Sequence, residues 1–192
     1  MDAPRAFCLL DFQEWLTKHA VPTTDVLVTC REDPEVSLLP STARVQEIRY
    51  ENGHDLHKLD LEKKDYDFMI VSQTLEHLYH PFQAMKQCWD HLRPGGYFFT
   101  SVPTTNIPHN TPIHFQEFYP MGLATLGLQA EFDIVEIGFW GNQEYLLKLF
   151  STYEWPDIYG LTTLVADPNY PAACWGLFRK PTQPLLFMQA SS

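Results

Sequence analysis

The stretch 65–102 most constrains the fold, because it holds two apolar runs with a helical pattern between them. Residues 68–71 read Phe-Met-Ile-Val, a continuous apolar run that is typical of a strand buried on both faces. Pro81 suits the first position of a helix. Pro-Gly-Gly at 94–96 ends this helix in a sharp turn before a second apolar run at 97–102. Strand, helix and strand in this order predict two neighbouring parallel strands with a right-handed crossover.

The rest of the chain alternates between helical and strand-like patterns. Within 81–93 the apolar residues Phe82, Met85, Trp89 and Leu92 recur at helical spacing, which predicts that this face packs on the sheet. Further helices are expected at 7–20, 120–128 and 143–150, and further strands at 25–30, 43–50, 132–139 and 172–178. The sequence therefore predicts one α/β domain over 1–192, with a mostly parallel sheet and helices on both faces.

The segment between the two expected N-terminal strands is short. About fifteen residues separate them, and Pro34 and Pro40 interrupt this segment. Because a single crossover between parallel strands takes a dozen or more residues, a full strand–helix unit does not fit between 29 and 44. We therefore predict a sheet that is reduced in its N-terminal half.

Composition excludes several classes of function. The formal charge is −11 and no run of lysine or arginine occurs, which argues against binding to nucleic acid or to an anionic membrane. Apolar residues make up 45% of the chain, too many for a disordered protein. The four cysteines are scattered in mostly apolar contexts, as expected for reduced core thiols. No signal peptide or bilayer-spanning run is present, so we expect a soluble, cytoplasmic protein.

Several motifs in order resemble one enzyme family. Residues 65–77 read Asp-x-Asp-Phe-x-x-x-Ser-x-x-Leu-Glu-His, and 92–96 read Leu-Arg-Pro-Gly-Gly. His109, Pro112 and Phe115 follow, and then the segment 132–142. Together they resemble the class I S-adenosylmethionine-dependent methyltransferases, in the branch with Leu-Glu-His after the fourth strand. The resemblance covers roughly 52–180. It implies a Rossmann-like fold with seven strands, S-adenosylmethionine as cofactor and methyl transfer to an unidentified small-molecule acceptor.

The resemblance also implies site residues. The segment 51–56 is similar to the family's Gly-Asp-Ala segment beside the adenine, with Asn52 in place of the Asp. Asn52-Gly53 is equally well explained as a turn. His109 is the weak candidate for a general base, and His114 and Glu117 stand where the family has Asp and Arg. The residues expected to bind the cofactor are Asn52, His54, Ser72, Gln73, Glu76 and His77.

The largest departure from the family follows the first strand. A glycine-rich loop normally lets the backbone approach the cofactor there, but residues 31–40 contain no glycine. Glu32, Asp33 and Glu35 are expected to repel the cofactor's carboxylate. We also find no acidic strand end that would bind the ribose hydroxyls. Cofactor binding is therefore expected to be weak or lost.

Other chemistries are less well supported. His54-x-x-His57 and His77-x-x-His80 have ligand-like spacing, but no third ligand is evident, so no metal site is predicted. A serine hydrolase is disfavoured because Gly-x-Ser-x-Gly is absent. Two hypotheses stay open: an active methyltransferase, and an inactive methyltransferase-fold protein that serves as a binding module. The apolar tail 181–188 is expected to pack on the body or on a partner, either a second copy or another protein.

Overall fold

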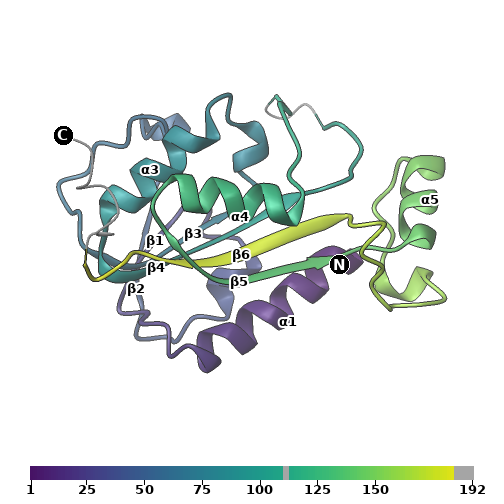
Figure 1. Ribbon diagram of the computed structural model, residues 1–192, viewed down its shortest axis with the longest axis horizontal. Coiled ribbons are helices and arrows are strands. Elements are labelled where there is room, and N and C mark those ends of the chain that lie inside the picture. The colour runs from purple at the N-terminus through teal and green to yellow at the C-terminus, as the bar shows by residue number, and fades with distance from the viewer. Residues whose placement is uncertain (110–112, 184–192) are drawn as a thin grey trace, which may run out of the picture.

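The computed structural model describes residues 1–109 and 113–183. These residues form one six-stranded sheet in the order β2-β1-β3-β4-β6-β5 (Figure 1). Four neighbouring strands are parallel, and β6 runs antiparallel between β4 and β5. Most of the predicted tail 181–188 lies outside the described residues. The strands are β1 (Asp25–Val28), β2 (Arg44–Glu47), β3 (Tyr66–Ser72), β4 (Leu92–Pro103), β5 (Asp133–Trp140) and β6 (Ala173–Arg179).

The pairing of β3 with β4 confirms the predicted βαβ unit. The two strands are parallel, with Phe68 opposite Tyr97 and Ser72 opposite Ser101. Because β3 is buried on both faces, its side chains alternate between two apolar clusters. Phe68 and Ile70 join one cluster, whereas Met69 and Val71 join the other.

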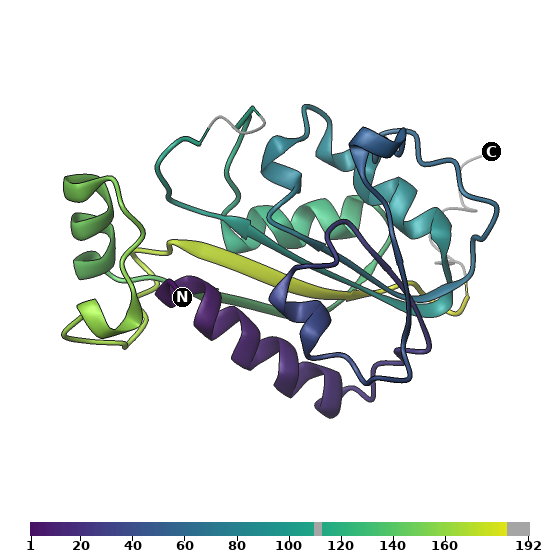
Figure 2. The same ribbon diagram turned by 180° about the vertical axis from the view of Figure 1, so that it is seen from behind.

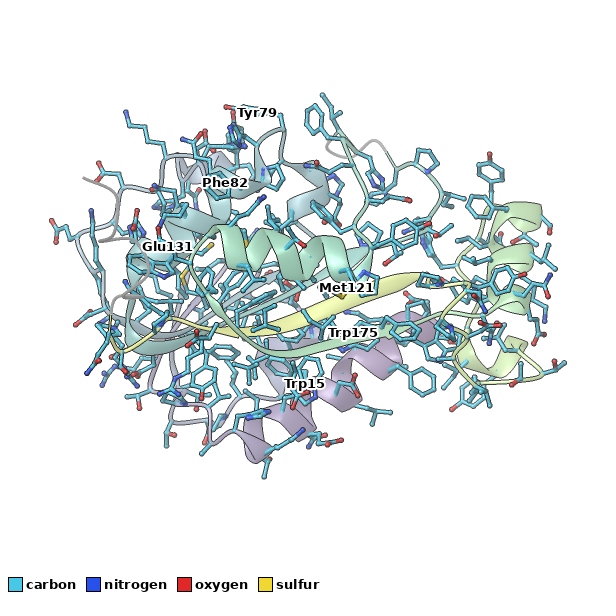
Figure 3. All side chains as sticks on the ribbon, in the orientation of Figure 1. Trp15, Tyr79, Phe82, Met121, Glu131 and Trp175 are labelled. Atoms are coloured by element: carbon cyan, nitrogen blue, oxygen red, sulfur yellow. The ribbon has the colours of Figure 1, made fainter. Side chains whose placement is uncertain are left out.

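The helices form a layer on each side of the sheet. Helix α1 (Ala3–Lys18) covers one face, and α3 (Pro81–His91) and α4 (Pro120–Gln129) cover the other (Figures 1 and 2). Figure 3 shows Trp15 of α1 and Met121 of α4 on opposite sides of the sheet. Helix α5 (Gln143–Thr152) lies beyond one end of the sheet. The observed three-layer arrangement is the predicted α/β fold.

The sheet-facing row of α3 differs from the prediction. Met85 is buried as expected, but Phe82 is 37% exposed and Trp89 is only partly buried. Ala84 and Cys88 are fully buried instead, since their small side chains let the helix approach the sheet closely. Trp89 lies at the edge of this interface, where the ammonium of Lys180 sits 3.8 Å from its ring centroid.

The N-terminal half is reduced, as predicted. Between β1 and β2 the chain forms only the single turn α2 (Pro34–Ser37). Because α2 is so short, α1 covers the face of β3 that carries Phe68 and Ile70. The Phe12 ring of α1 lies 6.1 Å from that of Phe68, centroid to centroid. Helix α1 begins at Ala3, earlier than predicted, because the Asp2 carboxylate accepts a hydrogen bond from the Arg5 backbone N–H at 2.9 Å.

Two glycines of α4 give a matched test of the packing between α4 and β6. A Cβ on Gly127 would lie 2.3 Å from the Phe178 ring, whereas one on Gly122 would meet nothing within 4 Å. Alanine is the better helix former by about 1 kcal/mol, so Gly122→Ala is expected to stabilise the protein by roughly this amount. Gly127→Ala is expected to lower stability by about 1–3 kcal/mol, because the buried ring cannot move freely.

Urea unfolding of both variants and the wild type measures these changes. Equal stabilisation by the two substitutions would show that α4 does not pack on Phe178 as described.

Candidate functional site

The carboxyl ends of the four parallel strands all lie at the same edge of the sheet. Strands β1, β2 and β3 end at Val28, Glu47 and Ser72, and β4 ends at Pro103. Open α/β sheets bind their ligands outside this edge. Most of the functional side chains described below lie at or after one of these strand ends or come from the start of α1, which reaches the same edge.

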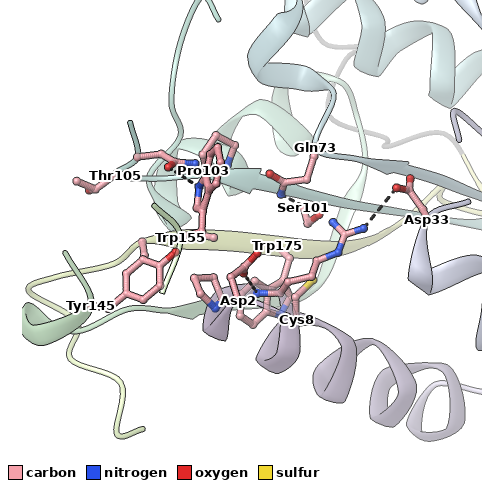
Figure 4. A pocket seen from close by; sticks show the side chains of 15 residues that line it. Asp2, Cys8, Asp33, Gln73, Ser101, Pro103, Thr105, Tyr145, Trp155 and Trp175 are labelled. Atoms are coloured by element: carbon pink, nitrogen blue, oxygen red, sulfur yellow. Dashed lines mark hydrogen bonds and ion pairs between the residues drawn. The ribbon is translucent and has the colours of Figure 1, made fainter. Parts of the chain in front are cut away.

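A cavity of about 310 Å³ opens at this edge (Figure 4). The start of α1 forms one wall with Arg5 and Cys8, and residues following β3 and β4 form others. Gln73 lines it just after β3, in the left-handed region at φ +46°, which is strained for a residue with a side chain. Its amide Nε2 donates to the Ser101 Oγ at 3.2 Å. On the far wall the Trp155 Nε1 donates to the Asn106 side chain at 3.0 Å.

A buried charge network lies where β1 and β3 end. The Arg5 guanidinium is 2.9 Å from one Glu35 carboxylate oxygen and 3.4 Å from the Asp33 carboxylate. The Ser72 hydroxyl donates to the other Glu35 oxygen at 3.0 Å. Glu35 is fully buried, and burial together with the Glu35 charge raises the pKa of Asp33 to about 6.

This network changes the expected role of the acidic segment. Asp33 and Glu35 share the Arg5 cation, and Asp33 also lines the cavity. Glu32 is exposed and pairs with Arg49 at 2.8 Å. Helix α2 follows β1 at the place where the family has its glycine loop, and residues 31–40 contain no glycine. The loss of the close backbone approach to a cofactor stays a prediction, and this is its physical basis.

Glu47 is a candidate site residue that the sequence analysis missed. Strand β2 pairs in parallel with β1 and ends at Glu47, opposite Val28. The expectation that no acidic strand end exists is therefore wrong. The expected strand at 43–50 ran past Glu47 and hid its terminal position. The Arg49 hydrogen bond and the Arg31 backbone N–H, 2.8 Å from its Oε1, lower the pKa of Glu47 and keep it ionised.

A cluster of ionisable side chains follows β3 and β4. The His77 Nε2 lies 3.2 Å from the His109 Nε2 and 3.8 Å from a Glu76 carboxylate oxygen. The His114 ring centroid is 4.6 Å from that of His109. Burial raises the pKa of Glu76 to about 8 and lowers the pKa of His77 and His114. At neutral pH Glu76, His77 and His114 are therefore largely uncharged, which lets them lie together.

The structure places the predicted site residues in two groups. Ser72, Gln73, Glu76 and His77 follow the end of β3, and His109 meets His77 from the loop after β4. Asn52 and His54 belong instead to the turn after β2. There the 3₁₀ turn Tyr50–Asn52 ends at Gly53 with φ +88°, so Asn52-Gly53 does form a turn, and its role beside the adenine stays a prediction. Asn52 is exposed and His54 is half-buried.

The predicted histidine spacings do not form metal sites. His57 bonds Asp55 at 2.8 Å and stacks on Tyr79, while His80 is exposed at the start of α3. The described residues that converge instead are Glu76, His77 and His109, and also Cys30, Glu32 and Glu47. Sequence spacing could not show the first set, because His109 is brought to His77 by the pairing of β3 with β4.

This sheet order, with its antiparallel β6 and its ligand edge, is that of the Rossmann-like methyltransferases. Residues 7–163 match the family model described as a methyltransferase domain. The chain therefore belongs to this methyltransferase domain family.

Individual relatives share the fold at low sequence identity. A probable S-adenosylmethionine-dependent methyltransferase of Mycolicibacterium smegmatis is 29% identical over 106 residues, covering 52% of this chain and 41% of the relative. The chain thus spans about two fifths of that protein. The Burkholderia thailandensis 1,6-didemethyltoxoflavin-N1-methyltransferase, solved with bound 1,6-didemethyltoxoflavin and S-adenosylhomocysteine, has a TM-score of 0.61 at 16% identity, over 90% of this chain and 78% of its own. A putative Bacillus halodurans methyltransferase has a TM-score of 0.56 at 13% identity, over 90% and 100%.

Among the described residues, no helix combines the length and the hydropathy that a membrane crossing requires.

The Asp33 carboxyl gives a pH-dependent test of the charge network. The pKa of the Asp33 carboxyl is about 6 in the folded protein, whereas its ordinary value, which we take for the unfolded chain, is 3.8. Between pH 3.8 and about pH 6 the folded protein therefore keeps a proton on Asp33 that the unfolded chain has released. This group contributes stability at low pH, and the contribution is lost as the pH rises through about 6. Asp33→Asn removes the titration. As the pH rises from about 4 to about 7, the free energy of unfolding of the variant is expected to increase by up to about 2 kcal/mol relative to that of the wild type. Solvent screening keeps the difference below the full value that the pKa shift would give.

Chemical unfolding at a series of pH values measures this difference. Parallel pH profiles for the two proteins would show that Asp33 is not desolvated beside Glu35.

Proposed function

We propose that this chain binds S-adenosylmethionine at the carboxyl ends of β1, β2 and β3 and transfers its methyl group to a small-molecule acceptor. The carrying observation is Glu47, an ionised carboxylate at the end of β2 beside the end of β1, in a chain of the methyltransferase domain family. A carboxylate there accepts hydrogen bonds from two neighbouring ribose hydroxyls. Methyl transfer needs little protein chemistry beyond alignment, because the cofactor supplies an activated methyl group when bound.

The residues around Glu47 fit the adenosine half of the cofactor. Arg31 and Arg49 use part of the Glu47 carboxylate, but an ionised carboxylate has about four acceptor positions. Asn52 is exposed on the turn after β2, where its amide oxygen can accept from an adenine amino group. His54 follows on the same turn, and its buried Nδ1 has no partner among the described residues.

The methionine half meets a more crowded site. Ser72 lies beneath Glu35 and supports it, whereas Gln73, Glu76 and His77 are available on the segment after β3. Arg5 lines the same cavity as Gln73 and could take the methionine carboxylate, but Glu35 and Asp33 already hold it. We therefore infer weak binding, because the cofactor carboxylate must compete with two carboxylates for one guanidinium.

The cavity beside Arg5 suits the acceptor. A volume of about 310 Å³ is at the small end of the range for ligand sites. Its lining combines the indoles of Trp155 and Trp175 with the amides of Gln73 and Asn106. A small, flat, polar molecule matches these surfaces. His109 is the proposed general base, which takes the proton that the acceptor loses as its bond to the methyl carbon forms.

Calorimetric titration with S-adenosylmethionine tests the cofactor site. We expect saturable binding, weaker by about two orders of magnitude than at a low-micromolar site, which corresponds to a few kcal/mol. Glu47→Gln and Asn52→Ala are each expected to weaken binding by about tenfold or more, through loss of a ribose or adenine contact. Glu51→Gln is the matched control, since Glu51 is an exposed acid on the same turn.

Three results would contradict this assignment. Low-micromolar or tighter binding would mean that another segment replaces the glycine loop. Unchanged affinity in Glu47→Gln and Asn52→Ala would place the cofactor elsewhere. No heat at millimolar cofactor would favour the inactive, methyltransferase-fold binding module.

A separate variant tests the competition for Arg5. Glu35→Gln keeps the size of the side chain and a hydrogen bond from Ser72, but it removes one of the two charges that hold the guanidinium. The variant is expected to bind S-adenosylmethionine several-fold more tightly than wild type. S-adenosylhomocysteine should gain equally, because it has the same carboxylate. Weaker binding of both ligands by a variant with a wild-type circular dichroism spectrum would refute the role of Arg5.

A further inference from the structure

We propose that Glu76, His77 and His109 form a binding site for a divalent transition-metal ion of the zinc type. The proposal goes beyond methyl transfer, and it is tested without the cofactor. In the metal-bound form His109 is a ligand, so it acts as a general base only when the ion is absent. One ligand atom from each residue lies within 4.8 Å of the other two. Two imidazoles and one carboxylate are a common donor set for Zn²⁺ and for other first-row ions.

The separation of the two imidazole nitrogens suits a shared ion. The His77 and His109 Nε2 atoms are 3.2 Å apart. Nitrogens held at about 2.0–2.1 Å from a tetrahedral ion lie about 3.3 Å from each other. The Glu76 oxygen is 3.8 Å from the His77 Nε2, so it needs only a small rotation to join them.

The hydrogen bond on the other side of His77 prepares it as a ligand. Its Nδ1 is 3.0 Å from the Ile113 carbonyl oxygen. A carbonyl only accepts, so Nδ1 carries the proton in the neutral ring and Nε2 presents its lone pair to the cluster. Metal-binding histidines usually make this second contact, which fixes the tautomer and the ring orientation.

The buried, unpaired carboxyl group of Glu76 is a second, independent observation that points to a ligand at this site. The residue is 0% exposed, and neither carboxylate oxygen has a hydrogen-bond partner among the described residues. Burial of an unpaired carboxyl group is costly. A hydrogen bond between the two histidines would leave both Glu76 oxygens unsatisfied, whereas an ion satisfies one of them and both imidazole lone pairs.

The surroundings leave room for exchange and for a further ligand. His77 is 11% exposed at its side chain and His109 is half-buried, so the cluster is open on one side. His114 lies next to His109, and its buried Nδ1 has no partner among the described residues. Its Nε2 donates to the Gln116 carbonyl at 3.1 Å, which leaves a lone pair on Nδ1. The sequence analysis predicted no metal site, because neither His54-x-x-His57 nor His77-x-x-His80 offered a third ligand. The fold brings Glu76 and His109 to His77 instead.

Titration of the chelator-treated full chain, without a histidine tag and without S-adenosylmethionine, tests the site. Zn²⁺ is expected to bind one to one with a dissociation constant of about 1 µM or tighter. His77→Ala and His109→Ala should each weaken binding by about tenfold or more. His80→Ala is the matched control, because His80 is an exposed histidine close to the site. Circular dichroism shows whether each variant is folded.

Co²⁺ gives a second readout on the wild-type chain. Ligation by imidazoles in a tetrahedral site is expected to produce intense visible absorption that Zn²⁺ abolishes by displacement. The proposal is overturned if Zn²⁺ shows no saturable binding, if folded His77→Ala and His109→Ala variants bind like wild type, or if Co²⁺ retains its aqueous spectrum. Binding of Mg²⁺ in preference to Zn²⁺ would also overturn it, since Mg²⁺ prefers oxygen ligands.

Discussion

The burial of β3 on both faces governs the arrangement of the rest of the chain. Phe68 and Ile70 need cover on one face, and Met69 and Val71 need it on the other. Helices α3 and α4 cover the second face, but α2 is only one turn long and cannot cover the first. Helix α1 takes this role through Phe12 and Trp15. The reduction between β1 and β2 is therefore compensated by a helix that precedes the sheet in sequence.

The position of α1 has a direct effect on the ligand edge. A helix that runs along this face brings its first turn to the carboxyl ends of β3 and β4, where Arg5 and Cys8 line the cavity. Arg5 then pairs with Glu35, whose side chain is fully buried. A buried charge without a partner is strongly destabilising. The packing that replaces the missing unit thus also fills part of the space that a glycine loop would leave open. With the cofactor bound as proposed, this one ion pair would couple fold stability to cofactor access.

The sequence predicted the parts of the fold that local patterns determine. The apolar run at 68–71, Pro81 and the Pro-Gly-Gly turn were enough to predict the βαβ unit, and the length between 29 and 44 was enough to predict the missing strand. Long-range consequences were harder to see. The role of Glu47 depended on where β2 leaves the sheet. The contact between His77 and His109 depended on strand pairing. Periodicity also placed Phe82 towards the sheet, because it does not report how closely a helix can approach.

The two halves of the ligand edge differ in electrostatics, and this difference explains how one fold could support two kinds of binding. Near β1 and β2 the edge is charged: Glu47 is ionised, and Arg5, Arg31 and Arg49 surround the acidic side chains. Near the loops after β3 and β4 the edge is uncharged at neutral pH, since burial favours the neutral forms of Glu76 and His77. A polar, charged cofactor suits the first region. In the second region neither Glu76 oxygen has a hydrogen-bond partner among the described residues, and the His77 and His109 Nε2 atoms lie 3.2 Å apart. A cation that displaces the Glu76 proton satisfies these groups.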